Sequence, residues 1–233
     1  MAVAISRPAS TVVLMDDAFR VYMTKRPNTM KFMGGFYVFP GGKVAKGDYE
    51  VNQERLKTFN LDESFHYSYY IAAARELFEE VGILLVFEED GKQLSTEKKK
   101  EYRRLLINEE ITFAQMLQEE NLHLDLTNLT YFGHIVTPEF NPVRFDTRFF
   151  MAKLPKSQIP KPHIGEIDHA AWIVPEDAVN GYNLELMIAP PTLHSLKAIF
   201  SFINGGELAM SAFNISDYLS PAQIEKMKKR ANH

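Results

Sequence analysis

Residues 75–83 read Arg-Glu-Leu-Phe-Glu-Glu-Val-Gly-Ile, and this stretch decides the fold. On a helical wheel at about 100° per residue, Glu76, Glu79 and Glu80 share an arc of roughly 100°, and apolar side chains occupy the remaining sides. Gly82 supplies the left-handed residue that commonly ends a helix. We therefore predict a helix that ends near Val81 and carries one acidic face.

The three carboxylates of this face have the spacing i, i+3 and i+4. At that spacing they repel one another and weaken the helix unless a partner neutralises them. Oxygen-only ligands suit Mg²⁺ or Mn²⁺, and Mg²⁺ commonly takes one or two protein carboxylates together with substrate phosphate. The alternative is a solvated acidic helix face, so the helix alone leaves both interpretations open.

A glycine pair upstream of the helix favours the metal site. Gly41 and Gly42 follow the aromatic run Phe36–Phe39, which predicts a short strand that enters a Pro-Gly-Gly loop. Glycines permit close backbone approach, and exposed loop N–H groups can bind an anionic phosphate. The alternative is a simple turn after a strand.

The remaining sequence predicts strands and helices in irregular alternation. Asp62 or Ser64 can cap the acidic helix, and the apolar run Ile83–Phe87 has the length of a strand. Ser95 and the capping-box pattern Thr112–Gln115 predict helices between residues 95 and 122. We expect further strands at 11–15, 20–24, 131–136, 144–153 and 167–173, and helices after Pro191 and Ser220. This order predicts one mixed α/β domain with helical insertions.

Composition limits the classes of protein that remain. The chain has 233 residues with 45% hydrophobic and 24% charged residues, an ordinary globular composition. It has no cysteine, which excludes disulfides, thiolate metal sites and cysteine nucleophiles. A net charge of −4 argues against nucleic-acid binding. No apolar run reaches the roughly 20 residues of a membrane span, and Met1–Arg7 does not resemble a secretory signal, so we expect a cytoplasmic protein without a membrane partner.

Two segments together resemble the two halves of a Nudix box. Gly42–Asp48 is similar to the first half, and Arg75–Ile83 matches every specified position of the second half, Arg-Glu-aliphatic-x-Glu-Glu-x-Gly-aliphatic. Asp48 stands where the family has glutamate, and 26 residues separate it from Arg75 where the family has seven. The extra residues must loop out while their ends stay close, which the logarithmic growth of loop-closure entropy tolerates.

A resemblance to one Nudix subgroup covers most of the chain. That subgroup includes the mammalian peroxisomal coenzyme A diphosphatases, and the matching segments occur in the same order: Lys31–Gly42, the split box, Thr137-Pro138, Arg144–Phe150, Gly165-Glu166 and Ala189–Thr192. The resemblance implies a Nudix-type α/β/α sandwich over residues 1–233. An insertion at about 49–67 would interrupt the box, and extra helices would lie at about 95–122 and 192–230.

The resemblance also implies an activity: metal-dependent hydrolysis of the diphosphate linkage in a nucleoside diphosphate derivative such as coenzyme A or acyl-coenzyme A. Mg²⁺ or Mn²⁺ would bind at Glu76, Glu79 and Glu80, and Arg75 would orient these carboxylates. The general base would be Glu76 or Glu166. Substrate-binding residues would be Arg26, Gly35, Phe39, Gly41 and Gly42. The partner would be a small diphosphate compound, and the family is compatible with a homodimer.

Two other functions stay open from the sequence. One is the same chemistry on a nucleotide sugar or a dinucleotide, and the other is a Nudix-like sensor that binds a nucleotide without cleaving it. We interpret two charged groups as structural: Arg144, Asp146 and Arg148 as a salt-bridged strand face, and the basic residues of 98–104 as a solvated helix face.

Overall fold

The computed structural model describes residues 3–30, 33–58, 61–87, 94–181 and 186–231. Its main sheet has the strand order β10-β2-β1-β9-β8, with β3 beside β2 and β4 beside β1. β1 and β9 run parallel, and the other pairs in this sheet are antiparallel. The strand bounds are Arg7–Met15 (β1), Val21–Lys25 (β2), Tyr37–Val38 (β3), Gly41–Lys43 (β4), Leu129–Val136 (β8), Phe145–Lys153 (β9) and His169–Ile173 (β10).

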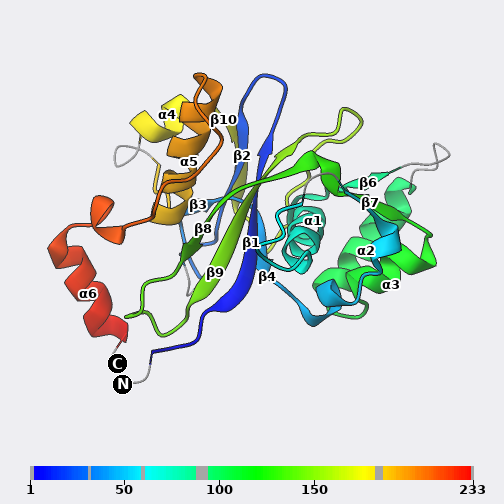
Figure 1. Cartoon of the computed structure of the whole chain (residues 1–233), viewed down its shortest axis with the longest axis horizontal. Helices are drawn as coiled ribbons and strands as arrows, with labels where there is room; N and C mark the ends of the chain where they lie inside the picture. The colour runs from blue at the N-terminus through cyan, green and yellow to red at the C-terminus, as the bar shows by residue number, and fades with distance from the viewer. Residues whose placement is uncertain (1–2, 31–32, 59–60, 88–93, 182–185, 232–233) are drawn as a thin grey trace.

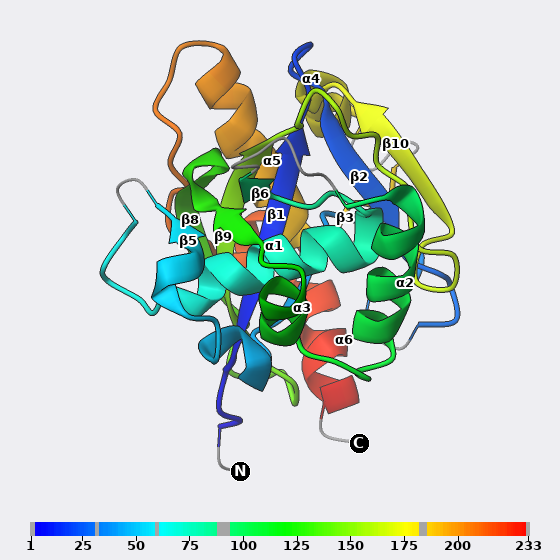
Figure 2. The ribbon, with the colours of Figure 1, turned by 90° about the vertical axis from the view of Figure 1, so that its right-hand side faces the viewer.

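Helices cover both faces of this sheet (Figure 1). One face carries the acidic helix α1 (Ser68–Val81), and α2 (Thr96–Ile107) and α3 (Phe113–Glu119) lie outside α1. The opposite face carries α4 (Pro175–Asn180) and α5 (Pro190–Ile203), and α6 (Pro221–Ala231) lies near one end of the sheet. Figure 2 shows α1 crossing in front of the strands, with α2 and α3 nearest the viewer. The predicted mixed fold with helices on two faces is therefore confirmed.

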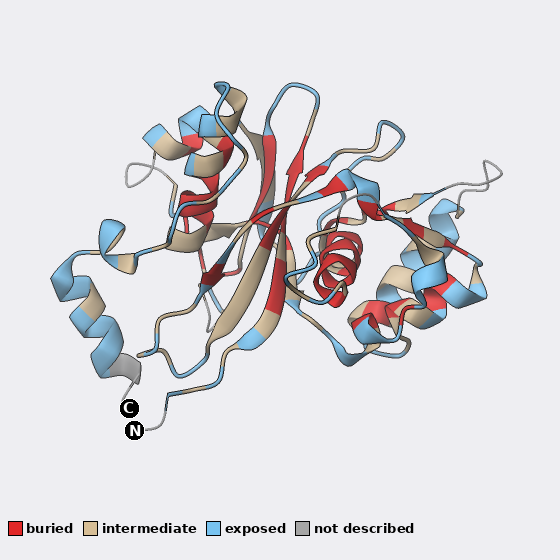
Figure 3. Cartoon of the chain, in the orientation of Figure 1, coloured by how far each residue is buried: buried red, intermediate tan, exposed pale blue. Residues whose placement is uncertain are grey.

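A hydrophobic core fills each side of the sheet (Figure 3). On the α1 side, Leu77 and Phe78 have no exposed surface and pack with residues of β1, β9 and α3. On the other side, Leu196 and Ile199 of α5 pack against β1, β2 and β8. Burial on both faces fixes the sheet between the two helical layers, because apolar area removed from water contributes about 25 cal/mol per Å². Within the described ranges, no helix has the length and apolar character of a membrane span.

The helix caps at 95 and 112 agree with the sequence prediction. The Ser95 side chain accepts a hydrogen bond from the Lys98 N–H, and Thr112 and Gln115 form a reciprocal capping box. α6 starts at Pro221, as predicted from proline at the first helical position.

The predicted start of the acidic helix was wrong. α1 begins at Ser68 and has no side-chain cap. The Asp62 carboxylate instead accepts a hydrogen bond from the Ser64 N–H, which closes a local turn ahead of the helix.

The strand predicted at Ile83–Phe87 is shorter than expected, and only Val86–Phe87 (β6) forms one. It joins β5 (Leu56–Lys57) and β7 (His123–Asp125) in a second, three-stranded sheet that the sequence did not predict. The segment after β4 forms two short 3₁₀ helices, Lys46–Tyr49 (η1) and Gln53–Arg55 (η2). Two more occur at Leu126–Asn128 (η3) and Ile215–Asp217 (η4). Lys31 of the family-like segment lies outside the described residues.

Candidate active site

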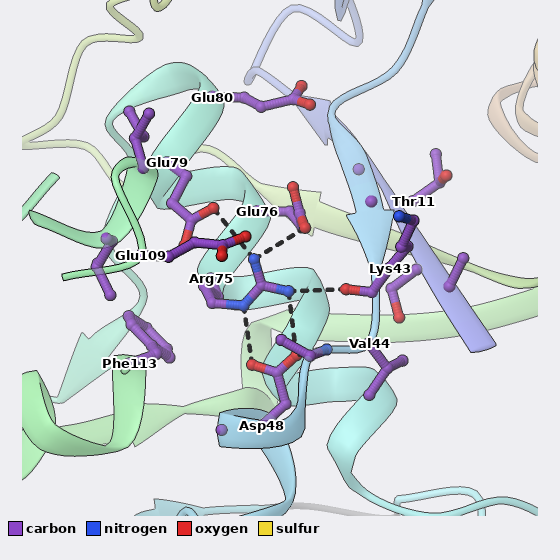
Figure 4. Close-up of a pocket in the computed structure, with 18 of the residues that line it drawn as sticks. Thr11, Lys43, Val44, Asp48, Arg75, Glu76, Glu79, Glu80, Glu109 and Phe113 are labelled. Carbon is purple, nitrogen blue, oxygen red and sulfur yellow. Dashed lines mark hydrogen bonds and ion pairs between the residues drawn. The ribbon is translucent and has the colours of Figure 1, made fainter. Parts of the chain in front are cut away.

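The acidic face of α1 borders a cavity of about 870 Å³. The helix buries its apolar side against the sheet, so Glu76, Glu79 and Glu80 are left on the side that faces the cavity (Figure 4). Gly82 ends the helix with φ 74°, a backbone conformation that most side chains avoid. The local pattern of residues 75–83 thus places three carboxylates at one cavity wall, as the helical wheel predicts.

Arg75 links the two halves of the split motif. Its Nε and Nη2 atoms donate to the two carboxylate oxygens of Asp48 at 2.9 and 3.0 Å, and Nη2 also donates to the Lys43 carbonyl at 2.8 Å. Asp48 has no exposed surface, and it also accepts from the Ala45 N–H at 2.7 Å. The planar guanidinium suits this fork better than a lysine ammonium would. The long insertion therefore leaves the ends of the motif in direct contact.

The remaining nitrogen of the Arg75 guanidinium, Nη1, contacts the acidic face of α1. Nη1 of Arg75 donates to Oε1 of Glu76 at 2.8 Å and to Oε2 of Glu79 at 3.1 Å (Figure 4). Burial by itself would lower the pKa of Arg75, but the charges of Glu76, Asp48 and Glu79 hold it above its ordinary value. Arg75 is therefore cationic and holds two carboxylates of the acidic face by hydrogen bonds.

Gly42 approaches Glu76 so closely that no larger residue fits without a shift. A Cβ atom at Gly42 would lie 2.3 Å from Oε1 of Glu76 and 2.6 Å from its carboxyl carbon. The expectation that Gly41 and Gly42 lie in a loop was wrong. Both glycines belong to β4, where Gly41 pairs with Thr11 of β1 and Gly42 pairs with Ser10.

Burial dominates the electrostatics of the cavity wall, and repulsion between like charges adds to its effect. Burial raises the pKa of Glu76 to about 7, with the Glu79 charge adding to the rise and Arg75 opposing it. Burial and the charges of Glu76 and Glu166 raise the pKa of Glu80 well above its ordinary value. Burial also raises the pKa of Glu79. A cation bound at this wall would relieve the repulsion.

The donor set fits a hard divalent cation, because Glu76, Glu79 and Glu80 offer only oxygen and lie on one helix face. Arg75 already engages two of these carboxylates. In the described ranges, no three His, Asp or Glu side chains are already arranged to hold a metal ion. The chemistry of the residues thus suits Mg²⁺ or Mn²⁺, and the assignment of the ligands stays a prediction.

Some predicted residues meet at this cavity and others do not. Arg26, Gly41, Gly42 and Glu166 line it together with the α1 carboxylates. Phe39 is 3% exposed and belongs to the core on the α5 side. Gly35 lies against the Asn28 side chain and Met187. Neither Gly35 nor Phe39 is among the described residues of the cavity wall, so we leave both out of the proposed site.

Helices α2 and α3 add a wall whose individual residues the sequence did not indicate. Leu106 and Ile107 of α2, Phe113 of α3, and Glu109 between these helices line the cavity. Glu109 has φ 56°, an uncommon value for a residue other than glycine. A capped helix pair could be predicted between residues 95 and 122, but no local pattern indicates which sheet face such a pair will cover.

The two structural interpretations of charged groups had different outcomes. Arg148 pairs with Asp146 and lies over the rings of Phe65 and Tyr69, so the predicted salt-bridged strand face is confirmed for this pair. The predicted solvated face of α2 was wrong for Arg103. Its guanidinium is partly buried and donates to the carbonyls of Glu79 and Glu80, because α2 packs across the end of α1.

Comparison with known proteins identifies the family. Residues 62–199, more than half of the chain, match the family model described as the NUDT19 Nudix domain. The chain belongs to the Nudix family. As a Nudix hydrolase it acts on phosphoric anhydrides, and hydrolases of this family generally need divalent metal ions.

Three Nudix proteins are similar to this chain at 26–28% sequence identity. The putative nudix hydrolase 7 of Caenorhabditis elegans is 27% identical over 220 residues, which cover 93% of this chain and 68% of the worm protein. The acyl-coenzyme A diphosphatase NUDT19 of Xenopus laevis is 26% identical over 235 residues, which cover 82% of this chain and 62% of the frog protein. A Nudix hydrolase crystal structure from Alicyclobacillus acidocaldarius is 28% identical and superimposes with a TM-score of 0.76, covering 91% of this chain and 100% of that chain.

Proposed function

We propose that this Nudix hydrolase cleaves the diphosphate linkage of coenzyme A or of an acyl-coenzyme A. The observation that carries the proposal is one cavity lined by three carboxylates of α1 and by Arg26, whose positive charge acts on Glu80. A diphosphate is polyanionic, so its hydrolysis depends on positioning and charge neutralisation more than on a covalent intermediate. The cavity volume of about 870 Å³ lies within the range of small-molecule sites.

Glu76, Glu79 and Glu80 would hold Mg²⁺ or Mn²⁺, with Glu80 as the principal ligand. A bound divalent ion neutralises phosphate charge and lowers the pKa of a coordinated water. Arg75 keeps Glu76 and Glu79 oriented through its fork to Asp48, and Arg26 offers positive charge near Glu80. The close approach of Gly42 leaves the Glu76 carboxylate at the cavity wall.

The general base is Glu76 or Glu166. Glu76 lines the cavity and is held in place by the Arg75 guanidinium, so it is positioned to accept a proton there. Glu166 lines the same cavity from the loop before β10, and its charge reaches both Glu79 and Glu80. Glutamine variants test the rival: if Glu166→Gln keeps kcat while Glu76→Gln loses about 10²–10⁴-fold, Glu166 is not the base.

The choice of coenzyme A rests on likeness to the frog acyl-coenzyme A diphosphatase and on Arg26, Gly41 and Gly42 at the cavity. The test is a product assay with Mg²⁺ or Mn²⁺ on coenzyme A, an acyl-coenzyme A, ADP-ribose, a nucleotide sugar and a dinucleotide. Release of adenosine 3′,5′-bisphosphate from coenzyme A is the expected result. Cleavage of the other compounds alone would refute the substrate and keep the chemistry, and nucleotide binding without turnover would refute both.

A further inference from the structure

The end of α1 is held from outside the helix. The last four carbonyls of a helix have no partner within it, so each needs another donor. Phe78 O accepts from the Gly82 N–H at 2.9 Å, and Val81 O accepts from the Lys161 N–H at 2.7 Å. The two carbonyls between them belong to Glu79 and Glu80, the residues whose side chains form the acidic wall.

Arg103 of α2 supplies donors to both of these carbonyls. Its Nε atom donates to Glu79 O at 2.7 Å, and its Nη2 atom donates to Glu80 O at 2.6 Å. A cation at this place also opposes the partial negative charge of a helix C-terminus. One side chain of α2 therefore fixes the backbone of two successive residues of the acidic face.

The loop between β9 and β10 also contacts the carbonyl of Glu80. The His163 N–H donates to Glu80 O at 2.8 Å, so Glu80 O receives both this loop and Arg103. The Gln158 side chain makes two further bonds, to the N–H and the carbonyl of Leu84, at 2.9 and 2.8 Å. At the other end of the loop, the Asp168 N–H donates to Lys25 O at 2.9 Å. Glu166 lies between these attachments and lines the cavity.

We propose that Arg103 is a positioning residue for hydrolysis: it fixes the end of α1 at the carbonyls of Glu79 and Glu80, and the Glu80 carbonyl is also where the Glu166 loop attaches, so that the acidic wall and Glu166 face one cavity. The inference rests on the proposed metal-dependent hydrolysis. Arg103 is not among the described residues that line the cavity, so it acts through Glu79 and Glu80 and not on the substrate. Partners that orient metal-binding residues typically change metal affinity or activity by about 10–100-fold when they are removed.

The neighbouring Arg104 is a matched control. It lies on the same helix, its side chain is 49% exposed, and it pairs with Glu101 and Glu110 at the surface. Arg103→Met removes the contact with the two carbonyls, and Arg103→Lys keeps the charge without the planar fork. Arg104→Met removes an arginine whose side chain bonds to Glu101 and Glu110 at the surface. Three measurements apply to each variant: Mn²⁺ binding followed by electron paramagnetic resonance without substrate, kcat and KM on coenzyme A at saturating Mn²⁺, and the melting temperature.

We expect Arg103→Met to lose about tenfold or more in kcat and about tenfold in Mn²⁺ affinity, with KM within about threefold of wild type. Arg103→Lys should recover part of the loss, and Arg104→Met should match wild type within about twofold. Unchanged kcat and Mn²⁺ affinity in Arg103→Met, with only a lower melting temperature, would overturn the inference. If Arg103→Met does not fold, Arg103→Lys decides by the same criteria. A wild-type protein that neither binds Mn²⁺ nor cleaves a diphosphate would instead refute the proposed function.

Discussion

A single arginine organises the candidate site at the scale of residues. Arg75 has five donor positions, and its contacts reach Asp48, the Lys43 carbonyl, Glu76 and Glu79. The carboxylates it orients repel one another, and burial makes their ionisation harder. The site is thus held by one cation while it keeps a surplus of negative charge for a divalent ion.

The raised pKa of Glu76, about 7 because of burial, predicts a pH effect on stability. An unfolded glutamate ionises near about pH 4.3, so between that pH and about 7 the folded protein retains a proton that the unfolded chain releases. The stabilisation from this group is full below pH 4.3 and is lost as pH rises through 7. Glu76→Gln keeps an acceptor for Arg75 and removes the titration.

We therefore expect metal-free Glu76→Gln to melt about 2–6 °C above wild type at pH 8 and close to wild type at pH 5. Thermal denaturation in the presence of EDTA measures this difference. The exposed Glu50 provides the control, since Glu50→Gln should leave the melting temperature unchanged at both pH values. A melting temperature of Glu76→Gln at or below that of wild type at pH 8 would contradict the prediction.

Gly42→Ala tests the contact between β4 and the acidic helix. The backbone of Gly42 is not left-handed, so the added methyl group acts only through its collision with the Glu76 carboxylate. We expect kcat to fall by at least about tenfold, because a small displacement of a reacting or metal-binding group has that effect. Glu50→Ala, at an exposed position of the segment that follows β4, is the control and should keep wild-type kcat. Steady-state kinetics decide, and equal kcat in the two variants would contradict the role of Gly42.

At the scale of elements, α2 and α3 form a wall of the cavity as well as a cover for α1. α2 and α3 carry Leu106, Ile107, Glu109 and Phe113 to the cavity, and each helix begins with its own side-chain cap. Local capping fixes where each helix starts, while burial of Phe113 and Leu106 fixes the pair against α1. The shape of the cavity at this wall therefore depends on α2 and α3, which lie outside the two halves of the Nudix box.

Thr112→Ala tests the capping box of α3. The Thr112 hydroxyl accepts from the Gln115 N–H, and the Gln115 side chain accepts from the Thr112 N–H at 2.7 Å. Loss of such a cap lowers the free energy of unfolding by about 1 kcal/mol. Urea denaturation measures the change, with an unaltered slope expected. Thr96→Ala, at an exposed position inside α2, should change the free energy by less than about 0.5 kcal/mol, and an equal loss in both variants would contradict the cap.

At the scale of the whole molecule, the buried pair of Asp48 and Arg75 joins η1 to α1 across the insertion. Asp48 has no exposed surface and the Arg75 side chain is 9% exposed. Removal of one partner of a buried ion pair leaves the other without its counter-charge in a poorly solvated place. The pair is thus the long-range link on which the geometry of the cavity depends.

Asp48→Ala should lower the free energy of unfolding by about 3 kcal/mol or more, as is typical for breaking a buried pair. Denaturant unfolding measures this value, and Mn²⁺ binding reports whether the acidic wall survives in the folded variant. Glu50→Ala, two residues further along the chain and exposed, should be close to wild type. A loss below about 1 kcal/mol in Asp48→Ala would show that the link is not needed for stability.

The sequence by itself determined the features that depend on short-range patterns. The 3.6-residue period of 75–83 sets which residues share the acidic face, Gly82 ends the helix, and Ser95 and Thr112 start the next two helices. Each of these depends on neighbours within one or two helical turns, so a local reading suffices.

Only the tertiary structure decided which distant residues meet. The contact of Asp48 with Arg75, the capping of Glu79 and Glu80 by Arg103, and the position of Glu109 at the cavity all join segments far apart in the chain. The burial of Phe39 on the far face of the sheet is of the same kind. Charge and hydrophobicity indicate that such groups need partners, but the partner is chosen by how the layers pack against the sheet, which no local pattern encodes.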